Sequence, residues 1–315
     1  MEGLVLDGRT LARALEDQLA ARVRALAERA GGSPPTLAII LVGADAAAAR
    51  YGRLKCDACR RVGIAPRPIL YPAHATTVEL LAGIERLNDD PRVRGIFLQL
   101  PLLDQVDARR CFDCIAPDKD AGGDGSSSFG RLALGEHACG PATPAAAMRL
   151  LSGYGIDLAG KEALVVGRGE MLGKPLALQL LGANATVTIC HANSPDLREA
   201  VRRAEVVVGA AGRPHFIKGD WLRDGAVVID AGSHPGGGGP RGLRGLRGLR
   251  GLRGLRGLRG DIELDAAAMA RCAAYTPVPG GLGPMTIAVL LNRTIAAAER
   301  AAGVLRTAPP PGPPG

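Results

Sequence analysis

The segment EALVVGRGEMLGKPLALQLLGANATVTICH, residues 162–191, decides how this chain folds. It begins with a short apolar and β-branched run, continues through a glycine-rich turn, and ends with a helical pattern followed by a second β-branched run. This order predicts a strand, a turn, a helix and a strand of a parallel α/β unit. Further apolar runs, at residues 204–212 and 225–232, are typical of buried strands and give the unit a Rossmann-like character.

The first half of the chain shows the same alternation. A buried strand is expected at residues 35–43, further strands at residues 65–73 and 93–103, and helices at residues 9–30, 46–63 and 76–90. Because neighbouring strands in this order need helical crossovers, this half also predicts a parallel sheet. The chain has 315 residues, which is enough for two such domains. The sequence therefore predicts an α/β protein.

Positive charge is concentrated in one stretch. Residues 241–259 contain seven arginines, and without them the net charge falls from +8 to +1. A folded nucleic-acid-binding face is not indicated, so nucleic acid is not expected as a partner. The chain lacks an apolar run long enough to span a membrane, and its first residues lack the apolar core of a secretory signal. We expect a cytoplasmic protein without a membrane partner.

Residues 236–259 are of low complexity and consist mainly of RGL triplets. A glycine at every third position is typical of collagen, but the proline content of collagen is missing. We expect a disordered, cationic insertion, and contact with RNA or an anionic lipid is the alternative. Residues 306–315 are expected to form a disordered, polyproline-like tail.

The seven cysteines do not suggest a disulfide framework, because their number is odd and no export signal is present. Cys56 and Cys59 form one C-x-x-C pair, and Cys111 and Cys114 form another. The two pairs are about 50 residues apart, far from the compact spacing of a zinc ribbon. We expect small apolar packing residues, and a metal site is the alternative.

The turn GRGEMLGKP, residues 167–175, lies between an expected strand and an expected helix. Glycines at 167, 169 and 173 permit a tight turn and a close backbone approach. The free N–H groups at the start of the helix could then bind a phosphate, and Arg168 could reach it. A structural turn without a ligand is the alternative.

A second candidate site surrounds the motif YGRLK. Tyr51 and Lys55 are four residues apart and share one helix face. Near the carboxyl edge of a parallel sheet, burial would lower the pKa of the lysine, and Gln99 in FLQLP could accept a hydrogen bond from its amine. A solvated surface lysine is the alternative. The proline- and glycine-rich loop TPVPGGLGPMT, residues 276–286, is expected to shape the edge of a pocket.

Seven stretches occur in an order and spacing that resemble one enzyme family. They are YGRLK, FLQLPLL, DKD, GRGEMLGKP, ATVTICH, VVIDAG and TPVPGGLGPMT. Together they are similar to the methylenetetrahydrofolate dehydrogenase/cyclohydrolase family over residues 3–305, apart from the RGL run. The resemblance implies a folate-binding catalytic domain of residues 1–145 plus 276–305, a Rossmann-like NAD(P)-binding domain of residues 146–275, and a cleft between them.

The resemblance also implies the reaction. Such an enzyme oxidises 5,10-methylenetetrahydrofolate to the methenyl form with NADP, or alternatively NAD, and hydrolyses the product to 10-formyltetrahydrofolate. Its partners are then tetrahydrofolate derivatives of one-carbon metabolism, which serves purine biosynthesis. The family further implies a homodimer formed through the dinucleotide-binding domain.

Individual roles follow from the same resemblance. Lys55 is the implied catalytic lysine that handles a proton or water during hydrolysis, Gln99 tunes it, and Tyr51 stacks on the folate. The folate side of the cleft would be lined by Pro277, Gly280 and Gly281. The NADP site would comprise Gly167, Arg168, Gly169, Gly173, Pro175, His191 and Asn193, with Arg168 on the 2′-phosphate.

The acidic segment DKDAGGDGSSSFG, residues 118–130, departs from the family. The family pattern is K-D-V-D-G, and its second aspartate holds the pterin ring. The ungapped alignment of KDAGG places Gly122 at that position, and Asp124 could substitute if the loop shifts. A charge-assisted bidentate bond is worth about 1.5–3 kcal/mol, so its loss would weaken folate binding by roughly one to two decades.

Ala48, Gly169 and Ala192 stand where the family has serines. The last two changes remove hydroxyls that would face the adenosine phosphate, so the choice between NADP and NAD stays open, and Asn193 or Ser194 could compensate. A diverged paralogue that has lost one or both activities is the alternative to a working enzyme. An RNA-binding protein built on the RGL run is a third interpretation.

Overall fold

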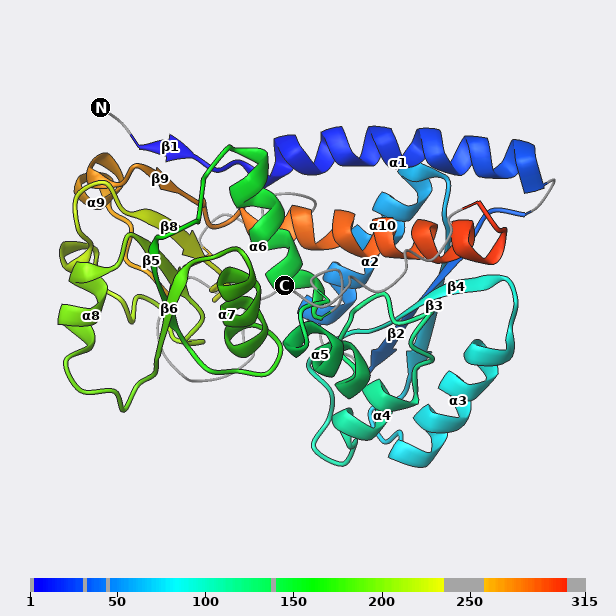
Figure 1. Ribbon diagram of the computed structural model, residues 1–315. Coiled ribbons are helices and arrows are strands. Elements are labelled where there is room, and N and C mark those ends of the chain that lie inside the picture. Colours follow the sequence, from blue (N-terminus) through cyan, green and yellow to red (C-terminus); the bar gives the residue numbers. More distant parts are fainter. Residues whose placement is uncertain (1–2, 31–32, 44–45, 137–139, 235–257, 305–315) are drawn as a thin grey trace. The chain divides into compact units, whose positions relative to one another are not determined.

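A computed structural model describes residues 3–30, 33–43, 46–136, 140–234 and 258–304 of the chain (Figure 1). Contacts divide the chain into two units. The six-stranded unit comprises Met1–Ala12 and Arg131–Thr286, and the three-stranded unit comprises Arg13–Gly130 and Ile287–Gly315. Both contain a parallel sheet with helices, so the predicted α/β class with two domains is confirmed. The expected domain limits, at residues 145 and 275, and the expected cleft stay predictions.

The three-stranded unit is built on a parallel sheet of order β3-β2-β4. The central strand β2 is buried along almost its whole length because helices and strands cover it on all sides, as its continuous apolar sequence predicts. The elements that lie wholly or mostly in this unit are α1 (Gly8–Ala30), β2 (Thr36–Val42), α2 (Ala46–Val62), β3 (Ala65–Tyr71), α3 (Thr77–Asp89), β4 (Val93–Leu98), α4 (Ala108–Cys114), α5 (Ser126–Ala133) and α10 (Leu282–Ala301). The strands and helices expected between residues 9 and 103 are confirmed.

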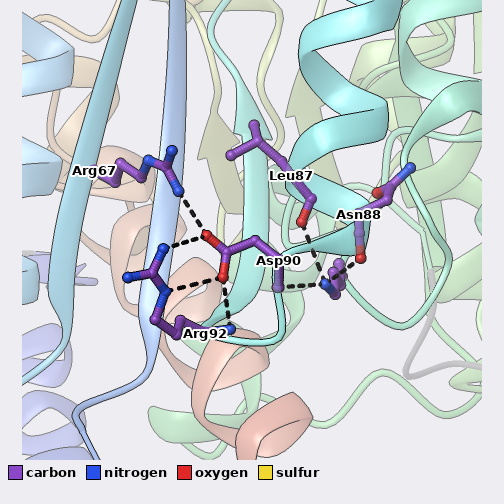
Figure 2. Close-up of polar contacts among 6 residues, drawn as sticks. Arg67, Leu87, Asn88, Asp90 and Arg92 are labelled. Atoms are coloured by element: carbon purple, nitrogen blue, oxygen red, sulfur yellow. Dashed lines mark hydrogen bonds and ion pairs between the residues drawn. The ribbon is translucent and has the colours of Figure 1, made fainter.

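The end of α3 is held by ionic groups (Figure 2). The Asp90 carboxylate accepts hydrogen bonds from Arg67 at 2.9 Å and from Arg92 at 3.0 Å. The buried ammonium group of Lys119 donates to three backbone carbonyls at this helix end, where the helix dipole favours positive charge. These carbonyls belong to Leu87, Asn88 and Asp90. Lys119 therefore anchors the acidic segment 118–130 against the unit at one end.

The six-stranded unit contains a sheet of order β1-β9-β8-β7-β5-β6 in which all the pairs are parallel. Its elements are β1 (Leu4–Val5), α6 (Ala142–Gly153), β5 (Glu162–Val166), α7 (Gly173–Gly182), β6 (Thr186–Cys190), α8 (Leu197–Arg203), β7 (Val206–Gly209), η1 (Gly219–Trp221), β8 (Val227–Asp230), α9 (Ala266–Arg271) and β9 (Ala274–Tyr275). The strand–turn–helix–strand order predicted for residues 162–191 is confirmed, and α7 packs against β5 and β6. The two-residue strands β1 and β9 were not anticipated, because they are too short to carry a periodic signal.

The C-x-x-C pairs pack as small apolar residues. Cys56, Cys59 and Cys111 are buried, and Cys114 is half-buried. Burial raises the pKa of the Cys59 thiol to about 12, so this thiol stays protonated at neutral pH. The packing role expected for the buried cysteines is confirmed.

His234 and Arg259 belong to the six-stranded unit and form an isolated antiparallel bridge. The two residues exchange backbone hydrogen bonds of 2.9 and 2.8 Å, and His234 Nε2 lies 2.6 Å from the Asp261 carboxylate. The buried Asp230 carboxylate accepts from the Asp261 and Ile262 N–H groups, both at 2.9 Å. The expected disorder of residues 236–259 and of the tail falls almost wholly on residues outside the described part of the chain.

Candidate active site

Lys55 lies on the inner face of α2 with its side chain buried in the three-stranded unit. Its Nζ donates a 2.7 Å hydrogen bond to Gln99 Oε1, and the Gln99 amide nitrogen donates a 2.6 Å bond to the Leu100 carbonyl, which fixes the amide orientation. Burial lowers the pKa of Lys55 to about 8. The expected lysine–glutamine pair and the lowered pKa are confirmed, and the surface-lysine alternative is wrong. A lysine of this kind can exchange protons near neutral pH.

Two aromatic rings flank the ammonium group. Lys55 Nζ lies 4.7 Å from the centre of the Phe97 ring and 5.6 Å from that of Tyr51, within the range of cation–π attraction. Phe97 was not among the predicted site residues. It precedes Gln99 by two positions on one strand end, so side-chain alternation could have placed both on the same face. The site therefore combines a buried cation with flat apolar surfaces.

The three aspartates of segment 118–130 lie in different environments. Asp118 is exposed. The Asp120 carboxylate accepts hydrogen bonds from the Gly123 and Gly125 N–H groups, at 2.7 and 3.2 Å, and so holds the loop from within. Asp124 is partly buried, and its carboxylate lies close to Gly122. Asp124 is thus the acid of this segment that is available to face a ligand.

The environment of Asp124 disfavours its charged form. Burial, and then the negative charge of Asp120, raise the pKa of the Asp124 carboxyl to about 7, although Arg293 and Arg109 oppose the shift. Arg109 Nη1 also donates to the Asp124 carbonyl at 2.8 Å, and Arg293 Nη1 donates to the Gly122 carbonyl at 2.9 Å. Sequence analysis missed these arginines, because they come from α4 and α10, far from the loop along the chain.

The glycine-rich turn of the six-stranded unit joins β5 to α7. A Cβ at Gly167 would lie 1.9 Å from the Ala210 carbonyl oxygen, and a Cβ at Gly173 would lie 2.2 Å from that of Gly167, so both positions need glycine. Helix α7 begins at Gly173, and the residue before it is Leu172, whose side chain cannot accept a hydrogen bond from the helix. Pro175 has no N–H group and the Lys174 N–H donates to the Gly169 carbonyl at 3.0 Å, so the Gly173 N–H is the donor of this first turn that can face a phosphate.

The other residues expected at the dinucleotide surround this turn. Arg168 is exposed and Pro175 is buried in the first turn of α7. The Gly167 N–H donates to the carbonyl of Cys190 at 2.7 Å, which ties the turn to the end of β6. The loop after β6 contains His191, whose N–H donates to Ser194 Oγ at 3.0 Å.

That hydrogen bond occupies the Ser194 hydroxyl within its own loop. Asn193 is exposed in the same loop, and its N–H donates to His191 Nδ1 at 3.2 Å. Ala192 is also exposed. Of the two residues suggested as replacements for the missing hydroxyls, Asn193 has the freer side chain. The residues fit a dinucleotide phosphate, because the turn combines close backbone approach, a helix start and an exposed guanidinium group.

The loop expected to line the folate side belongs to the six-stranded unit. It follows β9, and the Gly281 N–H donates to the Pro277 carbonyl at 2.8 Å. Gly280 has a φ of +127°, which favours glycine. The structure therefore brings Lys55, Gln99, Tyr51 and Asp124 together in one unit and places Pro277, Gly280 and Gly281 in the other. The lining role of the three loop residues stays a prediction.

Two protein-family models match the parts of the chain that contain these sites. The model for the catalytic domain of tetrahydrofolate dehydrogenase/cyclohydrolase matches residues 6–122, and the model for the NAD(P)-binding domain matches residues 141–302. The chain belongs to the tetrahydrofolate dehydrogenase/cyclohydrolase family. The Lys55 site falls within the first match, and the glycine-rich turn falls within the second.

Individual members of the family are similar to almost the whole chain. The bifunctional protein FolD of Acidobacterium capsulatum is 53% identical over 304 residues, which is 96% of this chain and all of the relative. That of Cellvibrio japonicus is 49% identical over 95% of this chain and 99% of the relative. The crystal structure of Trypanosoma brucei methylenetetrahydrofolate dehydrogenase-cyclohydrolase, complexed with NADP and an inhibitor, has a TM-score of 0.86 and 34% identity, and covers 96% of this chain and 99% of that one.

Proposed function

We propose that this protein oxidises 5,10-methylenetetrahydrofolate to 5,10-methenyltetrahydrofolate with NADP and hydrolyses the product to 10-formyltetrahydrofolate. The observation that carries the proposal is the buried Lys55–Gln99 pair between two aromatic rings, in a chain of this family. The 53% identity to a bifunctional relative over nearly the full length supports a working enzyme rather than a diverged paralogue.

Hydrolysis requires a group that moves a proton to or from water beside the methenyl carbon. Lys55 suits this role, because its pKa of about 8 leaves part of the population neutral near pH 7.5. Gln99 accepts from Nζ at 2.7 Å and keeps the amine in one orientation while it exchanges a proton. The ring of Tyr51 offers a flat surface beside the amine on which the folate can stack.

For the dehydrogenase step, NADP supplies the hydride acceptor. The chain holds it through the turn between β5 and α7, where glycines 167 and 173 admit the backbone close to the pyrophosphate. The exposed Arg168 is the candidate for the 2′-phosphate, since its guanidinium can bind a phosphate through two donors. Gly169, Pro175, His191 and Asn193 complete the proposed site.

A homodimer through the six-stranded unit is also proposed. β6 is an edge strand, and its Thr186, Thr188 and Ile189 are exposed, so it can pair with or pack on a second copy. In the three-stranded sheet, the edge strand β3 contains Pro66 and Pro68, which lack N–H groups and discourage such pairing. Light scattering should give a dimer mass for the wild type and a monomer mass for Ile189→Lys. A monomeric wild type would refute this assembly.

In the part of the chain that the structure describes, every helix is too short or too polar to cross a membrane. The cytoplasmic location and the role in purine biosynthesis stay predictions.

The test is absorbance-monitored conversion of 5,10-methylenetetrahydrofolate with NADP and with NAD in parallel, together with a separate assay of methenyl hydrolysis. Lys55→Met should abolish hydrolysis. Arg53→Met removes a positive charge from an exposed position of the same helix and should leave both rates near the wild-type values. Absence of turnover with both cofactors would refute the proposed function, and full hydrolysis by Lys55→Met would refute the role of the lysine.

A further inference from the structure

The space beside Gly122 is already filled by another residue. A Cβ built at Gly122 would lie 2.4 Å from Asp124 Oδ2 and 3.1 Å from Asp124 Cγ, closer than non-bonded atoms approach. The same point lies 3.5 Å from Cδ2 of Phe97, whose ring also contacts the Lys55 ammonium group. The Asp124 carboxylate therefore occupies the volume into which a side chain at position 122 would project.

The backbone of the loop folds back so that the Asp124 carboxylate lies beside Gly122. Gly123 has a φ of +73°, a left-handed conformation that reverses the chain between the two residues. Asp120 accepts from the N–H groups of Gly123 and Gly125 on either side of Asp124. These contacts hold the backbone on both sides of Asp124, from which its carboxylate reaches the space beside Gly122.

Contacts from two helices hold the loop from outside. Arg109 Nη1 of α4 binds the Asp124 carbonyl, and Arg293 Nη1 of α10 binds the carbonyls of Ala121 and Gly122, at 3.3 and 2.9 Å. Both guanidinium groups bring positive charge toward a carboxyl that burial and Asp120 disfavour as an anion. A carboxylate in such a place is not fully solvated, so it gains more from N–H donors of a ligand than an exposed acid would.

We propose that Asp124 supplies the carboxylate that binds the pterin ring, from a position two residues after the glycine that occupies the usual place. This inference rests on the proposed function. The pterin ring presents neighbouring N–H groups that a single carboxylate can bind with two parallel hydrogen bonds. The carboxylate would thus come from a different position in the chain and lie in the volume beside Gly122, where a Cβ would be 3.5 Å from Cδ2 of Phe97.

Substitutions at positions 122 and 124 test whether the carboxylate that binds the pterin ring comes from position 124 instead of position 122. Asp124→Asn keeps the shape but removes the charge, and Asp124→Ala removes the whole group. We expect both to raise the KM for 5,10-methylenetetrahydrofolate by roughly 10- to 100-fold with little change in the Kd for NADP. Asp118→Ala removes an exposed acid from the same segment and should leave the KM unchanged.

The decisive variant is the double substitution Gly122→Asp with Asp124→Ala. It should return the KM to within a few-fold of the wild type, because the carboxylate reaches the same volume from position 122. Gly122→Asp alone should raise the KM rather than lower it, since two carboxylates then compete for one place. Restoring the family residue at position 122 should therefore impair this enzyme as long as Asp124 is present.

The outcomes separate this inference from the proposed function. An inactive wild type would refute the function itself. An active wild type with an unchanged KM in Asp124→Asn would refute the role of Asp124 alone. Loss in Asp124→Ala without rescue in the double variant would also refute it, because Asp124 would then only support the loop. Thermal unfolding of each variant identifies any that fail to fold, and Asp124→Asn, which changes no volume, still gives the answer.

Discussion

Two glycines stand where the family has polar side chains, and the structure surrounds them in opposite ways. At Gly122, which replaces an aspartate, the volume of the missing side chain is filled by the Asp124 carboxylate, 2.4 Å from a built Cβ. At Gly169, which replaces a serine, no atom of the described residues other than its chain neighbours lies within 4 Å of a built Cβ. One position is filled by the carboxylate of a neighbouring residue and the other is open. A lost family residue therefore has to be judged by what now occupies its volume.

Gly167 adds a third case to this comparison, because backbone atoms occupy the volume that a Cβ at this position would need. Gly167→Ala would place a Cβ 1.9 Å from the Ala210 carbonyl oxygen at a φ of +138°. Overpacking and the unfavourable φ should together lower the free energy of unfolding by about 3 kcal/mol or more. Calorimetry would register a lower Tm, and NADP binding should weaken. A Tm within 1 °C of the wild type would contradict the close backbone approach on which the cofactor site depends.

The KM for methylenetetrahydrofolate should depend on pH through the Asp124 carboxyl beside Gly122. Because the pKa of Asp124 is raised to about 7, its carboxylate is mostly ionised above pH 7 and mostly protonated below it. The KM for methylenetetrahydrofolate should therefore rise toward tenfold per pH unit as the pH falls below 7. The dependence should vanish in Asp124→Asn. A wild-type KM that is flat between pH 5.5 and 8, measured at saturating NADP, would remove Asp124 from folate binding.

Position 169, which has open space around it, should accept a side chain without strain. Gly169→Ser adds a hydroxyl near the start of α7, where it can reach a bound phosphate, and should lower the KM for NADP by a few-fold. The unfolding free energy should change by less than about 0.5 kcal/mol. Gly169→Ala is the matched control, since it adds the Cβ without the hydroxyl. Equal effects of serine and alanine would show that backbone stiffness, rather than the hydroxyl, matters there.

The smallest effect is expected for the RGL run, where the sequence departs most from the family. Deletion of residues 241–258 should leave both activities, and the affinity for NADP, unchanged within experimental error. RNA binding, measured by filter retention at physiological salt, should be equally weak with and without the segment. A large fall in RNA affinity on deletion would instead support a nucleic-acid function of the RGL run.

Regular elements were predictable because their signals are local. The unbroken apolar run of β2 corresponds to a strand buried from Leu37 to Val42, and Thr76 caps α3 together with Glu79 as its sequence predicts. By contrast, β1 and β9 exist only because they pair with each other and extend a sheet, so two residues could not reveal them.

The site was predictable where chemistry and spacing agree. The Lys55–Gln99 pair follows from a helix face and a strand end that must meet at one sheet edge. The role of Asp124 could not be decided, because three acids within seven residues are equivalent until the loop is folded. The packing of Arg293 against this loop depends on a helix that lies more than 150 residues later in the chain.

The backbone pair between His234 and Arg259 has a consequence for how the gene can change. Because His234 and Arg259 already exchange backbone hydrogen bonds, adding or losing one triplet between them would alter the closure entropy of a connecting segment of this length by only about 0.1 kcal/mol. Slippage during replication can therefore lengthen or shorten the repeat without penalty from the fold. We expect triplet number to vary between strains while His234, Arg259 and Asp261 stay fixed, so the repeat could serve as a length marker for typing isolates.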